Sequence, residues 1–153
     1  MLALRNETDL AEQDFTRATE LAPRSSSAYL GVGRTARARG DRERARRAFD
    51  LAIALNPGYE SYAYLYRGML RAETGDLAGA IRDFSDCVRI NGNHVSAFYF
   101  RGMVFEQTWR TERALADYET CHLAQPHYWA AWKSRGLLLL KLALLVPLVA
   151  VAA

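Results

Sequence analysis

The stretch from Gly40 to Pro57, GDRERARRAFDLAIALNP, decides the fold of this chain, because its pattern recurs twice further along. The same order of Gly-Asp, alanine, aromatic residue, small residue and helix-stopping residue returns from Gly75 to Gly92. A third copy, without the leading glycine, runs from Ala114 to Pro126. A fixed period of about 34 residues is typical of stacked supersecondary units, none of which can bury its apolar face alone. The sequence therefore predicts a repeat protein.

Four positions of the repeat keep the size of their side chain from copy to copy. In chain order they are a glycine (Gly33, Gly68, Gly102), an alanine (Ala45, Ala80, Ala114), an aromatic residue (Phe49, Phe84, Tyr118) and a second small residue (Ala52, Cys87, Cys121). Two antiparallel helices approach closely only where small side chains face each other, so the glycine and alanine positions predict their contact. The aromatic residue would fill the space between units, and the terminal Pro would end the second helix. Each unit is thus predicted to be a pair of antiparallel helices.

This pattern resembles the tetratricopeptide repeat (TPR) family over roughly residues 9–136. The resemblance implies an all-α fold, a right-handed α-solenoid of stacked antiparallel helix pairs. The repeat domain would cover 1–136, as a partial repeat 1–25, full repeats 26–60, 61–94 and 95–128, and a partial repeat 129–136, followed by an apolar tail 137–153. Gly92 replaces one Pro, and Trp109 replaces the glycine expected in the third turn, so we expect that turn to differ locally.

The register of the repeats predicts eight helices and no strand. First helices are expected at 26–39, 60–74, 94–108 and 128–145, and second helices at 9–21, 42–55, 77–90 and 111–124. Asp41 and Asp76 follow a glycine and precede an apolar-periodic run, which is typical of helix N-caps. Thr111 is the predicted cap of the third full repeat.

The basic residues concentrate between Arg34 and Arg47, in a chain of 153 residues with a formal net charge of +3. One interpretation is a patch for an acidic peptide or nucleic acid. The other, which we favour, is a solvated arginine-rich surface, because no aromatic residue is interleaved for base stacking. Nucleic acid is therefore not an expected partner.

The sequence predicts no catalysis, no cofactor and no metal site. No nucleophile elbow, phosphate loop or dinucleotide fingerprint occurs. Cys87 and Cys121 occupy the second small position, so we expect small buried side chains without a disulfide, since equivalent residues of neighbouring repeats lie about 10 Å apart. Carboxylates of the second helices are expected to face solvent; these are Asp83, Asp86, Asp117 and Glu119.

In the resembling family the concave face is lined by first helices and binds partner proteins. Carried over residue by residue, the resemblance implies a partner-binding groove formed by Arg34, Arg37, Tyr62, Leu65, Tyr66, Met69, Tyr99, Phe100 and Met103. Tyr and Met side chains suit partner recognition, although these aromatics could instead pack among themselves or against the tail. The clamp with which some family members hold chaperone C-termini is missing, because its positions carry Leu30, Arg34, Tyr66, Ser96 and Phe100. A chaperone-tail reader is therefore disfavoured.

The predicted function is a protein–protein interaction scaffold that binds a partner peptide or segment in this groove. Alternatives are the repeat segment of a larger enzyme, for example a transferase or peptidase, and a membrane-tethered, self-associating assembly factor. The tail leaves three interpretations open: a membrane anchor, a helix that caps the stack, and the cut end of a longer chain. Its apolar run is close to the shortest that spans about 30 Å of hydrocarbon. No signal segment precedes the repeats, so a cytoplasmic location is expected, with the tail as the one route to a membrane.

Overall fold

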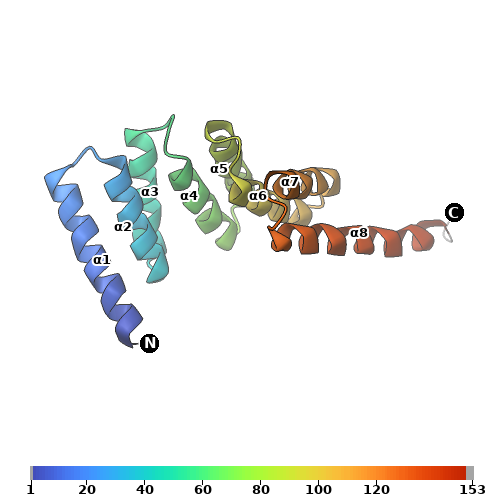
Figure 1. The fold of residues 1–153 in the computed structure, drawn as a ribbon, viewed down its shortest axis with the longest axis horizontal. Helices are drawn as coiled ribbons and strands as arrows, with labels where there is room; N and C mark the ends of the chain where they lie inside the picture. The colour runs from blue at the N-terminus through green and yellow to red at the C-terminus, as the bar shows by residue number, and fades with distance from the viewer. Residues whose placement is uncertain (1, 151–153) are drawn as a thin grey trace. The chain divides into compact units, whose positions relative to one another are not determined.

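The computed structural model describes residues 2–150, and it describes the side chains of residues 7–145. Within this part the chain forms eight α-helices joined by short turns, and no strand (Figure 1). The helices are α1 (Leu2–Leu21), α2 (Ser26–Ala38), α3 (Arg42–Leu55), α4 (Ser61–Glu73), α5 (Leu77–Ile90), α6 (Val95–Gln107), α7 (Thr111–Ala124) and α8 (Trp129–Ala150). The predicted all-α architecture is confirmed, and only the start of α1 and the end of α8 reach well beyond the expected ranges.

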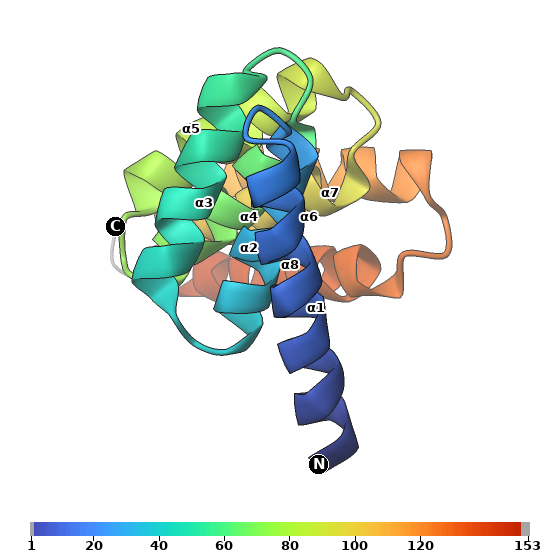
Figure 2. The ribbon, with the colours of Figure 1, turned by 90° about the vertical axis from the view of Figure 1, so that its left-hand side faces the viewer.

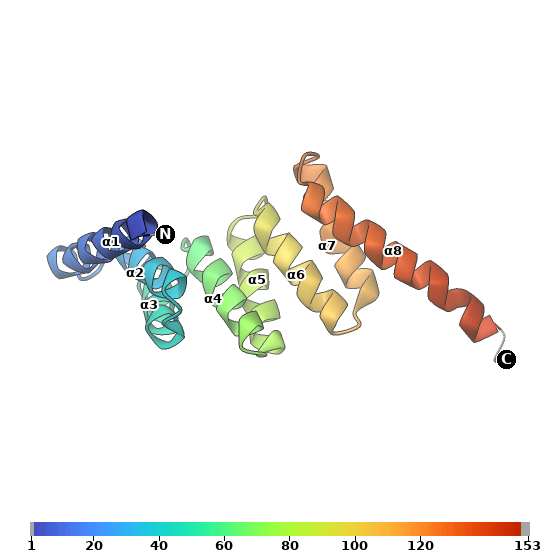
Figure 3. The same cartoon turned by 90° about the horizontal axis from the view of Figure 1, so that it is seen from below.

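The chain divides into two compact units, one with α1 to α5 and one with α6 to α8. In the first unit α2 packs against both α1 and α3 (Figure 2). In the same unit α4 pairs with α5. In the second unit α6 and α7 form an antiparallel pair, and α8 packs along α7 (Figure 3). Consecutive helices are therefore neighbours within each unit, as the repeat register predicts.

The glycine and aromatic positions meet inside each helix pair. A Cβ added to Gly68 would lie 2.7 Å from the ring of Phe84, and one added to Gly102 would lie 2.8 Å from the ring of Tyr118. Both aromatic side chains are fully buried. A larger residue at either glycine would therefore force the two helices apart.

The turns that enter the second helices share one backbone geometry. Gly40 and Gly75 have left-handed φ angles of 81° and 87°, and Trp109 adopts the same region at 59°. The backbone N–H of Arg110 donates to the carbonyl of Phe105 at 2.8 Å, and equivalent bonds of 2.9 Å close the two glycine turns. The expected local difference at Trp109 is therefore absent from the backbone, although a non-glycine residue pays a steric cost for this φ.

Two of the three predicted N-caps are confirmed. The side chain of Asp41 accepts a hydrogen bond from the backbone N–H of Arg44 at 3.0 Å, and that of Asp76 accepts one from Gly79 at 2.8 Å. The third prediction was wrong, because Thr111 is the first residue of α7 and Arg110 is its N-cap, with no side-chain hydrogen bond. The shared turn geometry places Arg110, not Thr111, in register with the two aspartates.

Two carboxylates predicted to face solvent are buried instead. Asp83 is 2 % exposed and Asp117 is 5 % exposed. Each forms a bidentate ion pair with an arginine of the paired first helix, Asp83 with Arg67 and Asp117 with Arg101. A carboxylate can remain buried in its charged form when a guanidinium satisfies both its oxygens, which is why this expectation was wrong.

Candidate partner-binding site

On α2 and α4 of the first unit, two of the predicted groove residues already contact each other. The guanidinium of Arg34 lies 5.5 Å from the centroid of the Tyr66 ring, a cation–π distance. The Tyr66 ring also stacks on Phe49, with centroids 5.9 Å apart. Arg37 lies 2.5 Å from the carboxylate of Glu73. Both predicted arginines therefore have partners within the unit.

The remaining predicted residues of this unit differ in exposure. Leu65 is only 5 % exposed and belongs to the core. Tyr62 is 51 % exposed, and Met69 is partly exposed. The period of the repeat could place these residues on the first helices, but it could not show which of them the neighbouring helix covers.

In the second unit the predicted aromatic residues pack among themselves. The ring of Tyr99 lies 5.3 Å from that of Tyr128, 5.5 Å from Phe100 and 6.0 Å from Tyr118. Tyr99 thereby completes the core around Val95. This packing is the alternative that the sequence left open for these aromatics. Met103, by contrast, is 44 % exposed.

Met103 opens into an apolar groove of about 850 Å³ that lies wholly within the second unit. We call it the α6/α8 groove. Its lining comes from α6, the turn after it, α7 and α8, and consists of Met103, Glu106, Gln107, Trp109, Thr111, Tyr118, Ser134, Leu138, Lys141, Leu142, Leu144 and Leu145. Leu144 and Leu145 are 64 % and 50 % exposed, so the groove offers apolar surface that no described residue covers.

The two charged side chains among these lining residues neutralise each other. The ammonium of Lys141 lies 2.5 Å from the carboxylate of Glu106. The same carboxylate accepts a hydrogen bond from the Tyr118 hydroxyl at 3.1 Å. Burial, together with the nearby Glu106 charge, raises the pKa of Tyr118, which keeps its hydroxyl protonated as a donor. The groove therefore presents apolar walls and a satisfied polar floor.

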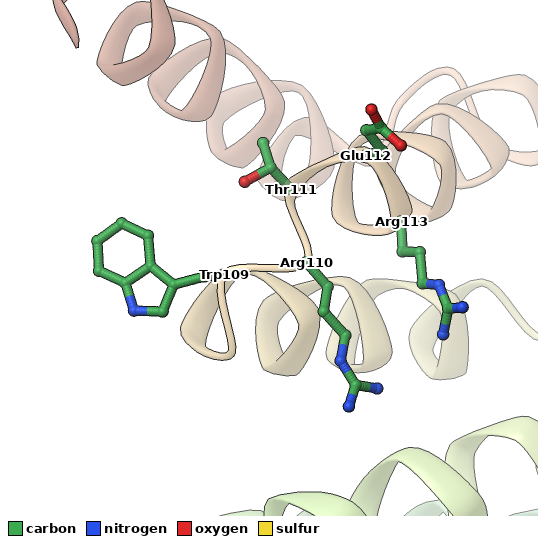
Figure 4. Close-up of a pocket in the computed structure, with 5 residues that line it drawn as sticks. All are labelled: Trp109, Arg110, Thr111, Glu112 and Arg113. Atoms are coloured by element: carbon green, nitrogen blue, oxygen red, sulfur yellow. The ribbon is translucent and has the colours of Figure 1, made fainter. Parts of the chain in front are cut away.

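The turn between α6 and α7 forms one end of this region and carries a second, shallower pocket (Figure 4). Figure 4 shows the indole of Trp109 pointing away from Arg110 and Arg113, and Trp109 is 86 % exposed. The guanidinium groups of Arg110 and Arg113 lie 6.0 and 5.8 Å from the ring centroid of Phe105. The sequence identified Trp109 only as a departure from the repeat pattern. It did not predict that the Trp109 side chain would be exposed to solvent.

The apolar tail begins inside a helix and not at a domain boundary. α8 continues through Leu137, and Leu138 is buried. None of the helices among the described residues is long and apolar enough to cross a membrane. Residues 151–153 of the predicted tail lie outside the described residues.

The arginine-rich stretch is largely paired with acids of its own unit. Arg39 contacts Asp9 and Glu12, and Arg44 contacts Glu12 as well. Arg46 lies 3.1 Å from Glu43. The paired arginines fit the solvated-surface interpretation of this stretch.

Within residues 7–145, no group of His, Cys, Asp and Glu side chains has the arrangement of a metal site.

The comparisons with known proteins agree with the geometry. Residues 26–59 match the family model described as tetratricopeptide repeat. The chain is 30 % identical over 98 residues to the UDP-N-acetylglucosamine–peptide N-acetylglucosaminyltransferase of Giardia intestinalis, a match that covers 64 % of this chain and 7 % of that protein. The chain thus corresponds to a small part of that relative.

Solved structures share the fold at low sequence identity. The crystal structure of MamA has a TM-score of 0.81 at 20 % identity, covering 93 % of this chain and 82 % of that chain. The first TPR of Spaghetti (RPAP3), bound to the HSP90 peptide SRMEEVD, has a TM-score of 0.74 at 18 % identity, covering 78 % and 94 %. The fold is that of α-helical repeat proteins built from helix pairs. More closely, residues 26–59 match a tetratricopeptide repeat, and the fold of the described residues is similar to that of solved tetratricopeptide-repeat structures.

Proposed function

We propose that this chain is a protein–protein interaction scaffold that binds an apolar or amphipathic segment of a partner protein in the α6/α8 groove. The observation that carries the proposal is the groove itself, which has a volume of about 850 Å³, mostly apolar lining residues, and the exposed side chains of Met103 and Leu145. The repeat fold supports it, because stacked helix pairs commonly present such surfaces to other chains.

The chemistry of the groove sets the chemistry of the partner. Since Lys141 already neutralises Glu106, the groove needs no charged group from the partner. Binding would come from burial of apolar side chains at about 25 cal/mol per Å², less the cost of ordering the segment. Met103 can adapt to differently shaped anchors, because its unbranched side chain has three rotatable bonds. We therefore expect a segment with two or more apolar anchors on one face.

We also propose a separate contact face on α2 and α4 of the first unit. Tyr62 and Met69 provide its apolar surface, and Arg34 held over Tyr66 provides a positive charge at its edge. A partner residue that is acidic would suit Arg34, because its cation–π contact leaves guanidinium N–H donors for a carboxylate. Tyr99 and Phe100, which pack with their neighbours, would support the surface of the second unit rather than enter a partner.

A library of displayed peptides provides the test, because the groove itself selects the sequences that bind to it. Peptides selected on the full chain should carry apolar anchors and should lose binding to Met103→Asp. The matched control is Leu123→Asp, since Leu123 is 72 % exposed on α7 and lies outside the groove. Circular dichroism and thermal unfolding of both variants would verify that each is folded. Selected peptides that bind Met103→Asp as well as the unchanged chain would refute the proposal.

A second candidate function is the repeat segment of a larger enzyme. The match to part of the Giardia transferase favours it, because that match covers 64 % of this chain but 7 % of that protein. In this case the α6/α8 groove would position a protein substrate for a catalytic domain elsewhere. Sequencing the flanking DNA tests the idea: in-frame coding sequence for a transferase or peptidase domain supports it, and stop codons on both sides remove it.

A further inference from the structure

One contact recurs between the two helices of a pair. On α4 an Arg-Gly dipeptide faces an Asp-aromatic dipeptide on α5. The guanidinium of Arg67 donates to both oxygens of Asp83 at 2.7 and 3.0 Å. Directly beside this ion pair, Gly68 makes room for the ring of Phe84. The four residues form a matched contact of charge and shape.

The pair of α6 and α7 repeats this contact with the same chemistry. Arg101 donates to both oxygens of Asp117 at 2.8 Å, and Gly102 faces the ring of Tyr118. The pair of α2 and α3 keeps the shape but lacks the charges: Gly33 faces Phe49, while Val32 and Ala48 take the places of arginine and aspartate. Arginine and aspartate are therefore present together or absent together in these three pairs.

α8 carries the first half of this contact, and no described residue supplies its second half. Its Arg135-Gly136 dipeptide stands in the register of Arg67-Gly68. A Cβ added to Gly136 would meet nothing within 4 Å, and Arg135 forms no ion pair with the described side chains. Leu139, one turn after Gly136, is 42 % exposed; Trp132, one turn before it, stacks on His122 of α7 and is 47 % exposed. α8 thus exposes the face that α4 and α6 bury against a second helix.

α1 carries the missing second half. Its Asp14-Phe15 dipeptide stands in the register of Asp83-Phe84. Asp14 is exposed and forms no ion pair with the described side chains. Phe15 contacts Gly31 of the following helix but is only partly buried, whereas Phe84 is fully buried between two helices. Among the described residues, no first helix pairs with α1.

The lengths of the two helices also correspond. α1 starts at Leu2, although the register of α3, α5 and α7 would start it at Thr8. α8 continues to Ala150, although the register of α2, α4 and α6 would end it at Lys141. In an antiparallel pair the end of the first helix lies beside the start of the second. The two extensions would therefore pack against each other, with the exposed Leu140 and Leu144 on the side of α8.

We propose that α8 of one copy takes α1 of a second copy as its paired helix, with Arg135 bound to Asp14 and Gly136 against Phe15. This interface is heterologous, so each copy that joins offers one free α1 or α8 to the next, and association continues into chains or closed rings. The proposal does not rest on the proposed function, because Arg135, Gly136 and Leu139 do not line the α6/α8 groove, and of the named interface residues only Leu144 belongs to both surfaces.

Sedimentation velocity of the full chain over a range of concentrations tests the proposal. The weight-average mass should rise with concentration beyond a dimer. Gly136→Trp should keep the chain monomeric, since its indole would compete for the space that Phe15 would take, and its Cβ meets nothing within 4 Å in the isolated copy. Gly92→Trp adds the same side chain at another open glycine and should associate normally. Unchanged helicity of both variants verifies folding.

Charge exchange identifies the partner helix. Asp14→Arg and Arg135→Asp should each lower the association constant about tenfold or more, because each leaves a like-charge pair in place of a bidentate ion pair. The double variant should recover most of the loss, since each interface again contains one arginine and one aspartate. A chain that stays monomeric at all concentrations overturns the proposal. The proposal is also wrong if Gly136→Trp associates as the unchanged chain does. A third contradicting result is that Gly136→Trp abolishes association while Asp14→Arg leaves it unchanged, because this result would indicate a contact between two α8 helices.

Discussion

Arg101 on α6 and Asp117 on α7 hold each other through two hydrogen bonds of 2.8 Å, and together they anchor the helix pair of the second unit. Their side chains are only 16 % and 8 % exposed. The planar guanidinium also lies 5.4 Å from the ring centroid of Phe98. Charge and apolar packing therefore act at one place in the structure.

Replacing Arg101 by Leu should destabilise the chain by about 3–5 kcal/mol, because Asp117 would remain buried without a counter-charge. Replacing both residues, as Arg101→Leu with Asp117→Leu, should cost far less, because no charge is then left buried. Urea unfolding of the two variants measures the difference. If Arg101→Leu alone were as stable as the double variant, Asp117 would not need Arg101 as its counter-charge, and the prediction would be wrong.

Trp109→Gly should stabilise the second unit by up to about 1 kcal/mol. A left-handed φ angle costs a non-glycine residue about 1–2 kcal/mol, and glycine removes this strain. Glycine also has more conformational freedom in the unfolded chain, which offsets part of the gain in stability. The matched variant is Gly75→Ala, which introduces this strain into the turn of the first unit and should destabilise it by a similar amount. Thermal unfolding of both proteins would detect the opposite signs, and equal signs would disagree with the shared turn geometry.

Two glycines of equivalent register should respond to alanine in opposite ways. Gly102→Ala should destabilise the chain by about 1–3 kcal/mol, since its Cβ would lie 2.8 Å from Tyr118. Gly136→Ala should stabilise it by about 0.5–1 kcal/mol, because alanine favours the helix and its Cβ meets open space. Denaturant unfolding at low protein concentration, where copies do not associate, measures both. A loss of stability in Gly136→Ala would show that the face of α8 is covered.

The two cysteines should make the chain less stable at alkaline pH. Burial raises the pKa of Cys87 and Cys121 from 9.0 to about 12. A raised pKa in the folded state stabilises the fold fully below pH 9, and this contribution is lost as the pH rises from 9 toward 12. Each thiol should thus remove up to about 1.4 kcal/mol per pH unit in that window.

The variant Cys87→Ala with Cys121→Ala isolates this effect, because Ala18 and Ala52 occupy the same position in other units. The unfolding free energy should fall less steeply between about pH 9 and pH 10.5 in the double variant than in the unchanged chain. Parallel pH profiles would mean that the thiols ionise without unfolding.

The sequence predicted the helices well because their ends depend on local signals. Asp41 and Asp76 cap helices through their own side chains, and glycine supplies the left-handed turn before each. Thr111 misled the prediction, since a threonine is a good cap in general but the turn at Trp109 had already fixed the register. Each local signal could be recognised in the sequence by itself. The sequence did not show which of two neighbouring signals, the threonine cap or the left-handed turn, would determine where the helix begins.

The candidate site could be predicted only in part, because exposure depends on neighbouring helices. Met103, expected in a groove, lines the α6/α8 groove, whereas Leu65 is core. That groove also needs Leu138 and the leucines that follow it on α8, which the sequence marked only as an apolar tail. The ion pair between Arg101 and Asp117 was missed. Its signal was present in the repeated spacing of arginine and aspartate, which the equivalent pair of Arg67 and Asp83 shows.

The substitution of Val32 and Ala48 for the arginine and aspartate of the other pairs has a consequence for misfolding. Repeats this similar could exchange partners while the chain collapses. If α2 were to pair with α5, Val32 would face Asp83 and leave a carboxylate buried without a counter-charge, at a cost of several kcal/mol. The uncharged pair of α2 and α3 therefore differs from the charged pairs. For each first helix, at least one wrong pairing would leave a charge buried without a partner, which disfavours that pairing.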